Sequence, residues 1–313
     1  MTDSPAVPPH DSDDARSAAL TSSCHVPVMA VEVVQWLRPA PGMQVADGTL
    51  GGGGHTRLLA TRVAPTGGVL AVDRDVRALE RAERELAGLP VRIAQANFCE
   101  LPDVMREAGI TSLDGILLDL GLSSDQLADD DRGFSFHAEG PLDLRFDVSR
   151  GKPAWQLMQR LSEQHLADLI FHYGEERFSR RIARAICARR HESPIQSARE
   201  LADLVRGCIP AKVRHQQRID PATRTFQALR IAVNDELKSL RLALEKLPEI
   251  LSATGRLAII SFHSLEDRMV KEAFTSDPRL RVLTKKPVTP TETEIDENPR
   301  ARSAKLRVAC RRN

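Results

Sequence analysis

The sequence predicts an α/β fold in which short buried strands alternate with amphipathic helices around one long helical insertion. Four apolar runs lie between residues 42 and 120, and a helical pattern follows each of the first two. Between residues 125 and 221 the patterns are helical and no convincing strand occurs. Neighbouring parallel strands need crossover connections, so this alternation predicts a parallel sheet. The insertion predicts a second, all-helical domain.

Each element follows from local spacing. Apolar residues at helical spacing predict a first helix over 31–37, which Pro39 stops because proline cannot continue a helix. Strands are expected over 42–47, 69–73, 91–96 and 113–124, the last with Asp119 emerging at the sheet edge, and helices are expected over 56–60 and 76–86. Helices are expected in the insertion over 155–161, 166–171, 178–186 and 201–205. After it, the pattern predicts one long helix over 225–244, a fifth strand over 255–262, a loop over 287–292 and final strands over 281–284 and 303–309.

Composition limits the class of protein. The chain has 313 residues and a net charge of +1, so a nucleic-acid surface must come from local clustering. Its five cysteines include no CxxC pair, and we therefore expect neither a zinc site nor a disulfide framework. Residues 1–23 are polar and proline-containing and are expected to be a disordered tail. No run approaches the roughly 20 apolar residues of a membrane span, so a soluble, cytoplasmic protein is expected.

A glycine-rich loop joins the first strand to the next helix, in the sequence from Asp47 through Gly51-Gly52-Gly53-Gly54 to His55. Glycines allow positive φ and let the backbone approach a ligand closely, and the first amides of a helix attract polar or anionic groups. The loop lacks the G-x-G-x-x-G register of dinucleotide sites, and His55 stands where a phosphate loop needs lysine. A nicotinamide enzyme and an S-adenosylmethionine methyltransferase remain as uses of such a loop.

Three strands end in an acid, namely Asp47, Asp73 and Asp119. The carboxyl ends of parallel strands form one edge of the sheet, where ligands of such folds bind. Asp73 lies about twenty residues beyond the loop, where an acid accepts hydrogen bonds from ribose hydroxyls. Helix capping is the alternative for Asp73, although Asp75 can supply that cap. The three acids therefore predict a nucleoside pocket at this edge.

The insertion contains a local excess of positive charge. Between residues 177 and 218, eleven basic side chains stand against three acidic ones, a surplus of eight. Arg180, Arg181 and Arg184 cluster within about one helical turn. Arginine makes forked contacts with phosphate, so this cluster predicts an RNA surface, with a solvated helix face as the alternative.

Several motifs together resemble the bacterial ribosomal RNA small-subunit methyltransferase H family, also called MraW. The motifs are His25 to Met29, Asp47 to His55, Asp114 to Ser124, Arg132 to Phe136, Gly140 to Arg145, Tyr173 to Phe178, Pro221 to Arg230, Ser261 to Arg268 and Asn298 to Arg302. They run from about His25 to the C-terminus.

The resemblance implies S-adenosylmethionine-dependent N4-methylation of a cytidine in the decoding region of 16S ribosomal RNA. It implies a class I, Rossmann-like methyltransferase domain over 24–124 and 222–313, with a helical substrate-recognition domain inserted over 125–221. By motif position, the family's cofactor contacts fall on Gly53, Gly54, His55, Asp73, Phe98, Asp119 and Gln126. Whether the chain forms a homodimer stays open.

The chemistry of the target amine predicts the catalytic side chains. The lone pair of the cytosine N4 amine is delocalised into the ring, so the site should offer acceptors that hold its N–H groups. We expect Asp119 with Asn234 or His263 to line this pocket, although His263 could instead be a satisfied strand-end histidine. Phe134, Phe136 and Trp155 could stack on RNA bases, but core packing is the simpler interpretation. The competing functions are a non-catalytic RNA-binding or ribosome-assembly protein and a nicotinamide-dependent oxidoreductase.

Overall fold

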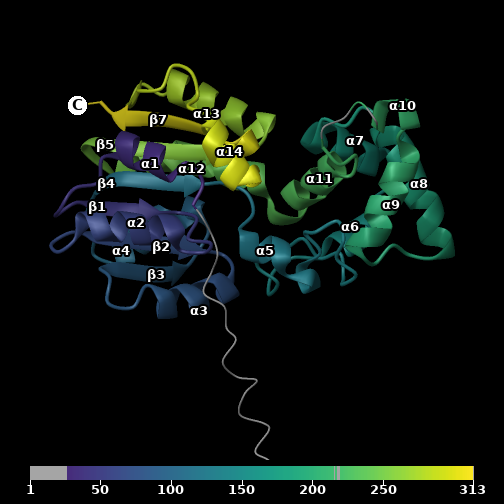
Figure 1. Cartoon of the computed structure of the whole chain (residues 1–313), viewed down its shortest axis with the longest axis horizontal. Coiled ribbons are helices and arrows are strands. Elements are labelled where there is room, and N and C mark those ends of the chain that lie inside the picture. The colour runs from purple at the N-terminus through teal and green to yellow at the C-terminus, as the bar shows by residue number, and fades with distance from the viewer. Residues whose placement is uncertain (1–26, 215, 217–218, 313) are drawn as a thin grey trace, which may run out of the picture.

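The computed structural model describes residues 27–214, 216 and 219–312. The tail expected at residues 1–23 and the motif residues His25 and Val26 lie outside this part. Figure 1 shows two lobes: a sheet covered by helices on one side of the view, and a group of helices on the other. No helix among the described residues has both the length and the apolar character needed to cross a membrane.

The sheet lobe is built on seven strands in the order β3-β2-β1-β4-β5-β7-β6. The strands are β1 (Gln44–Asp47), β2 (Gly68–Asp73), β3 (Val91–Gln95), β4 (Leu113–Asp119), β5 (Leu251–Ser261), β6 (Leu280–Val282) and β7 (Lys305–Arg311). Strands β1 to β5 pair in parallel, and β7 runs antiparallel to both β5 and β6. The predicted Rossmann-like α/β fold is therefore confirmed.

Strand β4 lies at the centre and is buried on both faces. Ile116 and Leu118 belong to one apolar cluster and Leu117 to another, because successive side chains of a strand point to opposite faces. The first cluster includes residues of α4 (Leu101–Glu107), α12 (Glu236–Ile250) and α13 (Ser264–Ser276). The second includes residues of α1 (Ala30–Leu37) and α2 (Gly54–Val63). Helices α3 (Val76–Glu85) and α14 (Glu292–Glu297) belong to the same lobe, and α5 (Ser124–Ala128) lies between the two lobes in the view of Figure 1.

The helical lobe has an apolar core of its own. Its helices are α6 (Ala154–Arg160), α7 (Glu163–Gly174), α8 (Ser179–Glu192), α9 (Ala198–Cys208), α10 (Ala211–Arg214) and α11 (Thr223–Asn234). Gly174 allows α7 to approach α11 closely, since a Cβ there would lie 2.4 Å from the Arg224 carbonyl oxygen. Phe134 is buried in this core, and Phe136 and Trp155 pack against it, so the core interpretation of these aromatic residues is confirmed.

The prediction of one helix over 225–244 is wrong. Helix α11 ends at Asn234 and α12 begins at Glu236, with Asp235 between them in the left-handed region at φ 52°. Apolar spacing continues through this break, so the sequence pattern does not reveal it. Phe226 and Leu229 of α11 pack in the helical lobe, whereas α12 packs on the sheet. The domain division at residues 221 and 222 stays a prediction, and this packing favours a boundary at Asp235 instead.

Candidate functional site at the carboxyl edge of the sheet

A pocket opens at the carboxyl edge of the sheet and encloses about 910 Å³ of empty space, counting the part open to solvent. This size is typical of small-molecule sites. Its lining includes six of the seven residues predicted to contact a cofactor, namely Gly54, His55, Asp73, Phe98, Asp119 and Gln126. Gly53 does not line it. That glycine precedes α2 with φ 76° and sets the turn that presents Gly54 and His55 to the pocket.

Asp47 holds the two ends of the glycine loop by hydrogen bonds. Its Oδ1 accepts a hydrogen bond from the Thr49 amide at 3.0 Å, and its Oδ2 accepts one from Thr56 Oγ1 at 2.7 Å. Thr49 Oγ1 in turn accepts from the Asp119 amide at 2.7 Å. Asp47 is fully buried, so it joins loop, helix and the end of β4 without facing the pocket.

Asp73 faces the pocket and holds the loop at the same time. Its Oδ2 accepts from the Gly51 amide at 2.8 Å and its Oδ1 from the Asp75 amide at 2.9 Å. Asp75, not Asp73, caps α3 by accepting from the Arg77 amide at 3.1 Å. Burial raises the pKa of Asp73 to about 6. Each carboxylate oxygen can accept more than one hydrogen bond, so Asp73 retains capacity for ligand hydroxyls.

Gln126 connects the pocket to the start of the insertion. It forms a reciprocal capping pair with Ser123, and its Nε2 donates to Asp75 Oδ2 at 3.1 Å. Buried Arg132 also pairs with Asp75 at 3.1 Å and donates to the carbonyl oxygens of Arg145 and Phe146. The motif that begins at Arg132 therefore anchors the insertion to the cap of α3, next to the pocket.

Asp119 lines the pocket with a side chain that is mostly buried. Among the described residues, its buried Oδ1 has no hydrogen-bond partner, and its Oδ2 lies 3.6 Å from His55 Nε2. Burial and the nearby charge of Asp47 raise the pKa of Asp119 to about 8, although Arg300 acts in the opposite direction. Such a carboxyl group can accept a hydrogen bond from a bound amine or stabilise a bound cation.

Two further acids, Glu236 and Glu266, line the pocket and were not predicted. Both oxygens of Glu236 accept from Arg230, at 2.8 Å and 2.9 Å. Glu266 Oε2 accepts from the Phe262 amide at 3.0 Å. Burial opposes ionisation of Glu266, but His263 and Arg230 outweigh it, and its pKa lies below the usual value. Glu266 belongs to the Ser261 to Arg268 motif, which could have identified it, whereas only the tertiary structure brings in Glu236.

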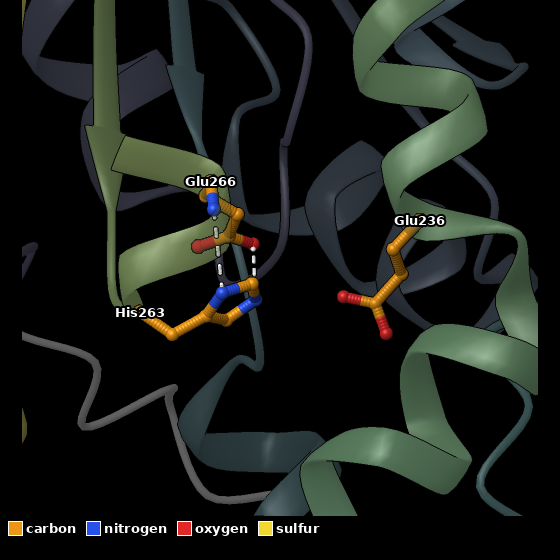
Figure 2. A group of neighbouring side chains, drawn as sticks. All are labelled: Glu236, His263 and Glu266. Atoms are coloured by element: carbon orange, nitrogen blue, oxygen red, sulfur yellow. Dashed lines mark hydrogen bonds and ion pairs between the residues drawn. The ribbon is translucent and has the colours of Figure 1, made fainter. Parts of the chain in front are cut away.

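His263 caps α13 and does not line this pocket. Its Nδ1 accepts from the Glu266 amide at 3.4 Å, and its Nε2 lies 3.2 Å from Glu266 Oε1 (Figure 2). Because Nδ1 accepts, the neutral ring carries its hydrogen on Nε2, which faces the Glu266 carboxylate. Glu266 lines the pocket and His263 does not, so this arrangement favours the strand-end interpretation of His263, and its role at the target amine stays a prediction.

Glu236, His263 and Glu266 bring potential metal-ligand atoms within 4.8 Å of one another. Figure 2 shows the Glu236 carboxylate pointing toward the His263 ring from the opposite side. In this arrangement, however, Nε2 carries a hydrogen and Nδ1 caps the helix, so neither nitrogen offers a free lone pair. Arg230 already neutralises Glu236. The three side chains are therefore paired within the protein, and a cation would have to displace these contacts.

Asn234, the other residue predicted beside Asp119, lies outside the lining of this pocket. Its side chain donates to the Leu144 and Arg230 carbonyl oxygens at 2.7 Å and 2.9 Å. Its Oδ1 accepts from the Phe146 amide at 2.7 Å. With its polar groups used by the backbone, Asn234 fastens the loop at residues 144–146, where Leu144 has φ 63°, to the end of α11. These contacts favour a positioning role for Asn234, and its predicted part in the chemistry stays a prediction.

The three arginines predicted to contact RNA are exposed on α8. Arg184 makes a long ion pair of 3.4 Å with Glu163. Other basic side chains of the insertion serve the fold: Arg190 donates to three carbonyl oxygens around the end of α6, and Arg206 pairs with Asp203 and Asp220. The exposed surplus is therefore smaller than the sequence count.

The strand order with an antiparallel β7, and a pocket bounded by a glycine loop and strand-end acids, define a class I methyltransferase architecture. A family model described as the MraW methylase family matches residues 22–312. The chain belongs to the MraW methylase family, which confirms the resemblance found in the sequence.

Relatives that match this chain over nearly their whole length are named as ribosomal RNA methyltransferases. The ribosomal RNA small subunit methyltransferase H of Rhodopirellula baltica is 47% identical, covering 99% of this chain and 99% of that protein. The protein of the same name from Deinococcus radiodurans is 48% identical, covering 98% of this chain and 95% of that protein. The solved structure of an rRNA methylase from Streptococcus thermophilus aligns with 91% of this chain and 94% of its own chain, at 12% identity and a TM-score of 0.43. The fold assignment therefore rests on the strand order and not on this likeness.

Proposed function

We propose that this protein is an S-adenosylmethionine-dependent methyltransferase that modifies the N4 amine of a cytidine in the decoding region of 16S ribosomal RNA. Membership of the MraW methylase family and the names of the relatives support methylation of small-subunit ribosomal RNA. The observation that carries the choice of an amine is Asp119 Oδ1, which is buried beside the glycine loop and has no hydrogen-bond partner within the described part of the chain. A cytoplasmic location, where ribosomes are made, is part of the same proposal.

In this proposal, the residues around the pocket hold the cofactor in three groups. Asp73 accepts hydrogen bonds from the ribose hydroxyls. Phe98 packs against the adenine, which suits its position in the lining. Gly54 and His55 face the methionine end, Gly53 shapes that turn and Gln126 completes the wall near Ser123. The cofactor supplies the methyl group as a sulfonium, a good leaving group for direct displacement.

The acids of the pocket act on the target amine. The pocket would contribute to the rate mainly by holding the target amine in a fixed orientation. Asp119 accepts one N–H of the amine, and Glu236 and Glu266 offer further acceptors from the same pocket. These contacts favour a more tetrahedral nitrogen. After attack, one carboxylate takes the proton that the nitrogen loses. A uracil carbonyl oxygen at the same place would be repelled by the carboxylates of Glu236 and Glu266.

The helical lobe contributes RNA recognition in this proposal. Arg180, Arg181 and Arg184 contact the phosphate backbone of 16S ribosomal RNA or of the small subunit. The cytosine must leave its stack to reach Asp119, so single-stranded or easily unpaired RNA is the better substrate. Replacing the three arginines by glutamate should weaken RNA binding in a salt-dependent way, and unchanged affinity would leave them as a solvated helix face.

The decisive experiment transfers tritiated methyl groups from S-adenosylmethionine to small ribosomal subunits and to free 16S RNA, followed by mass mapping of the product. The proposal expects one N4-methylated cytidine in the decoding region. Calorimetry with S-adenosylmethionine is the companion measurement. RNA binding without cofactor binding would instead support a non-catalytic assembly protein, and binding of a nicotinamide dinucleotide would support an oxidoreductase.

A further inference from the structure

A second cavity adjoins the cofactor pocket along the seam between the two lobes. It contains about 750 Å³ of space, including the part open to solvent. Its walls come from both lobes: Arg74 follows β2, Arg145 and Arg150 lie in the segment that enters the insertion, and Lys238 lies on α12. Arg74 and Ser239 line both cavities, so the two spaces are neighbours that share a wall at these residues. We call this second cavity the seam groove.

The seam groove carries positive charge. Four basic side chains line it, against the two acids Asp147 and Asp235. The Asp147 carboxylate is buried and already accepts from the Ser149 amide and hydroxyl at 2.9 Å and 2.6 Å. The groove therefore has a net surplus of two positive charges beside a pocket lined by acids.

Two of the basic groups are available to a ligand. Lys238 is exposed on the first turns of α12. The Arg150 side chain is 79% exposed, and its Nε lies 3.5 Å from Asp147, too far for a strong hydrogen bond. Arg145, by contrast, is held by Asp143 at 2.7 Å. Arg74 donates one bond to the Asn234 carbonyl oxygen at 2.8 Å and lines both cavities.

We propose that the seam groove binds the RNA backbone phosphate next to the target nucleotide, with Lys238, Arg150 and Arg74 as its contacts. This inference rests on the proposed function and adds a site to it. A base that enters the pocket brings its own flanking phosphates to the mouth, because the sugar-phosphate chain is continuous. The mouth of an acidic pocket repels phosphate unless a neighbouring group offsets it, and the seam groove is the adjoining cationic surface. Its open, extended form suits a passing strand better than a small free anion.

The chain offers a matched pair for the test. Lys238 and Arg241 both lie on α12 and are both exposed, but Arg241 lines a different cavity, with Met269 and Arg279. Lys238→Glu and Arg150→Glu should each weaken the affinity for a single-stranded RNA of the decoding-region sequence roughly tenfold. Each should also lower the slope of log affinity against log salt by about 1. Lys238→Arg should keep wild-type affinity, and Arg241→Glu should change neither quantity.

RNA affinity is measured by fluorescence anisotropy at several salt concentrations and S-adenosylmethionine affinity by calorimetry, both on the full chain. The proposal would be wrong if Lys238→Glu and Arg241→Glu lost the same amount of RNA affinity. It would also be wrong if the salt slope of RNA binding were unchanged in Lys238→Glu. Loss of cofactor binding in Lys238→Glu would also overturn it, because the residue would then be structural. A wild-type protein that binds this RNA without methylating it would refute the proposed function, while the anisotropy comparison still tests the groove.

Discussion

The Asp73 carboxylate accepts a hydrogen bond from the Gly51 amide at 2.8 Å across 22 residues of sequence. The end of β2 and the glycine loop are therefore one unit: the acid that offers oxygens to a ribose also holds the loop that faces the rest of the cofactor. The second oxygen accepts from the Asp75 amide, which leads into α3. A change at Asp73 is expected to alter both the ligand contact and the loop.

Asp73→Asn should weaken S-adenosylmethionine binding by roughly tenfold to a hundredfold, because a charged acceptor for two hydroxyls is replaced by an amide. Asp73→Ala should weaken binding further, since it also leaves the Gly51 amide without its partner. Calorimetry measures both. Asp103→Asn, at an exposed carboxylate on α4, is the matched control and should bind as the wild type does. Equal affinity in all three variants would remove Asp73 from the site.

Asp119→Asn should change how stability depends on pH. The pKa of Asp119 is raised from 3.8 to about 8, so the folded protein keeps a proton that the unfolded chain releases near pH 4. The free energy of unfolding therefore falls as pH rises between these values, by up to roughly 1.4 kcal/mol for each pH unit from this group. Asparagine does not titrate. Relative to the wild type, the variant should gain stability between pH 5.5 and 7.5, as urea unfolding measures. If the free energy of unfolding fell equally with rising pH in the wild type and in the variant, the raised pKa of Asp119 would be contradicted.

Glu236→Gln should lower kcat for methyl transfer by roughly tenfold or more while cofactor affinity stays unchanged, because a neutral amide accepts the amine N–H less well and takes no proton. Single-turnover methylation under saturating RNA measures the chemical step. Glu245→Gln, at an exposed position on the same helix, is the control and should leave kcat unchanged. Full activity in Glu236→Gln would leave Asp119 and Glu266 as the acceptors.

Asn234→Ala should destabilise the protein by about 2–4 kcal/mol, since the backbone groups of Leu144, Arg230 and Phe146 lose their partner. Asn234→Asp should also destabilise, because a carboxylate accepts from Phe146 but does not donate to the two carbonyl oxygens. Thermal unfolding measures both variants. If Asn234 instead met the substrate, the variants would fold with wild-type stability and lose kcat alone.

Much of the site could be predicted because it depends on local order along the chain. Asp73 and Asp119 follow buried strands, and parallel strands bring their carboxyl ends to one edge, so their convergence follows from the fold class. The cap at Asp75 was predictable for the same reason, since capping depends on residues within one turn. His263 shows where this reasoning stops. A polar residue at a strand end has two local interpretations, and only the tertiary contact with Glu266 favours one of them.

The sequence by itself determined the parallel sheet, the glycine loop, the acids at the strand ends and the helical character of the insertion, because apolar periodicity and turn residues act over a few positions. Only the tertiary structure decided where the helix over 225–244 breaks, and hence that Asn234 belongs to a wall and Glu236 to the pocket. A left-handed residue at Asp235 leaves the apolar pattern unchanged while redirecting the chain. The seam groove likewise could not be predicted from the sequence, because its basic residues come from separate segments that meet only when the two lobes pack.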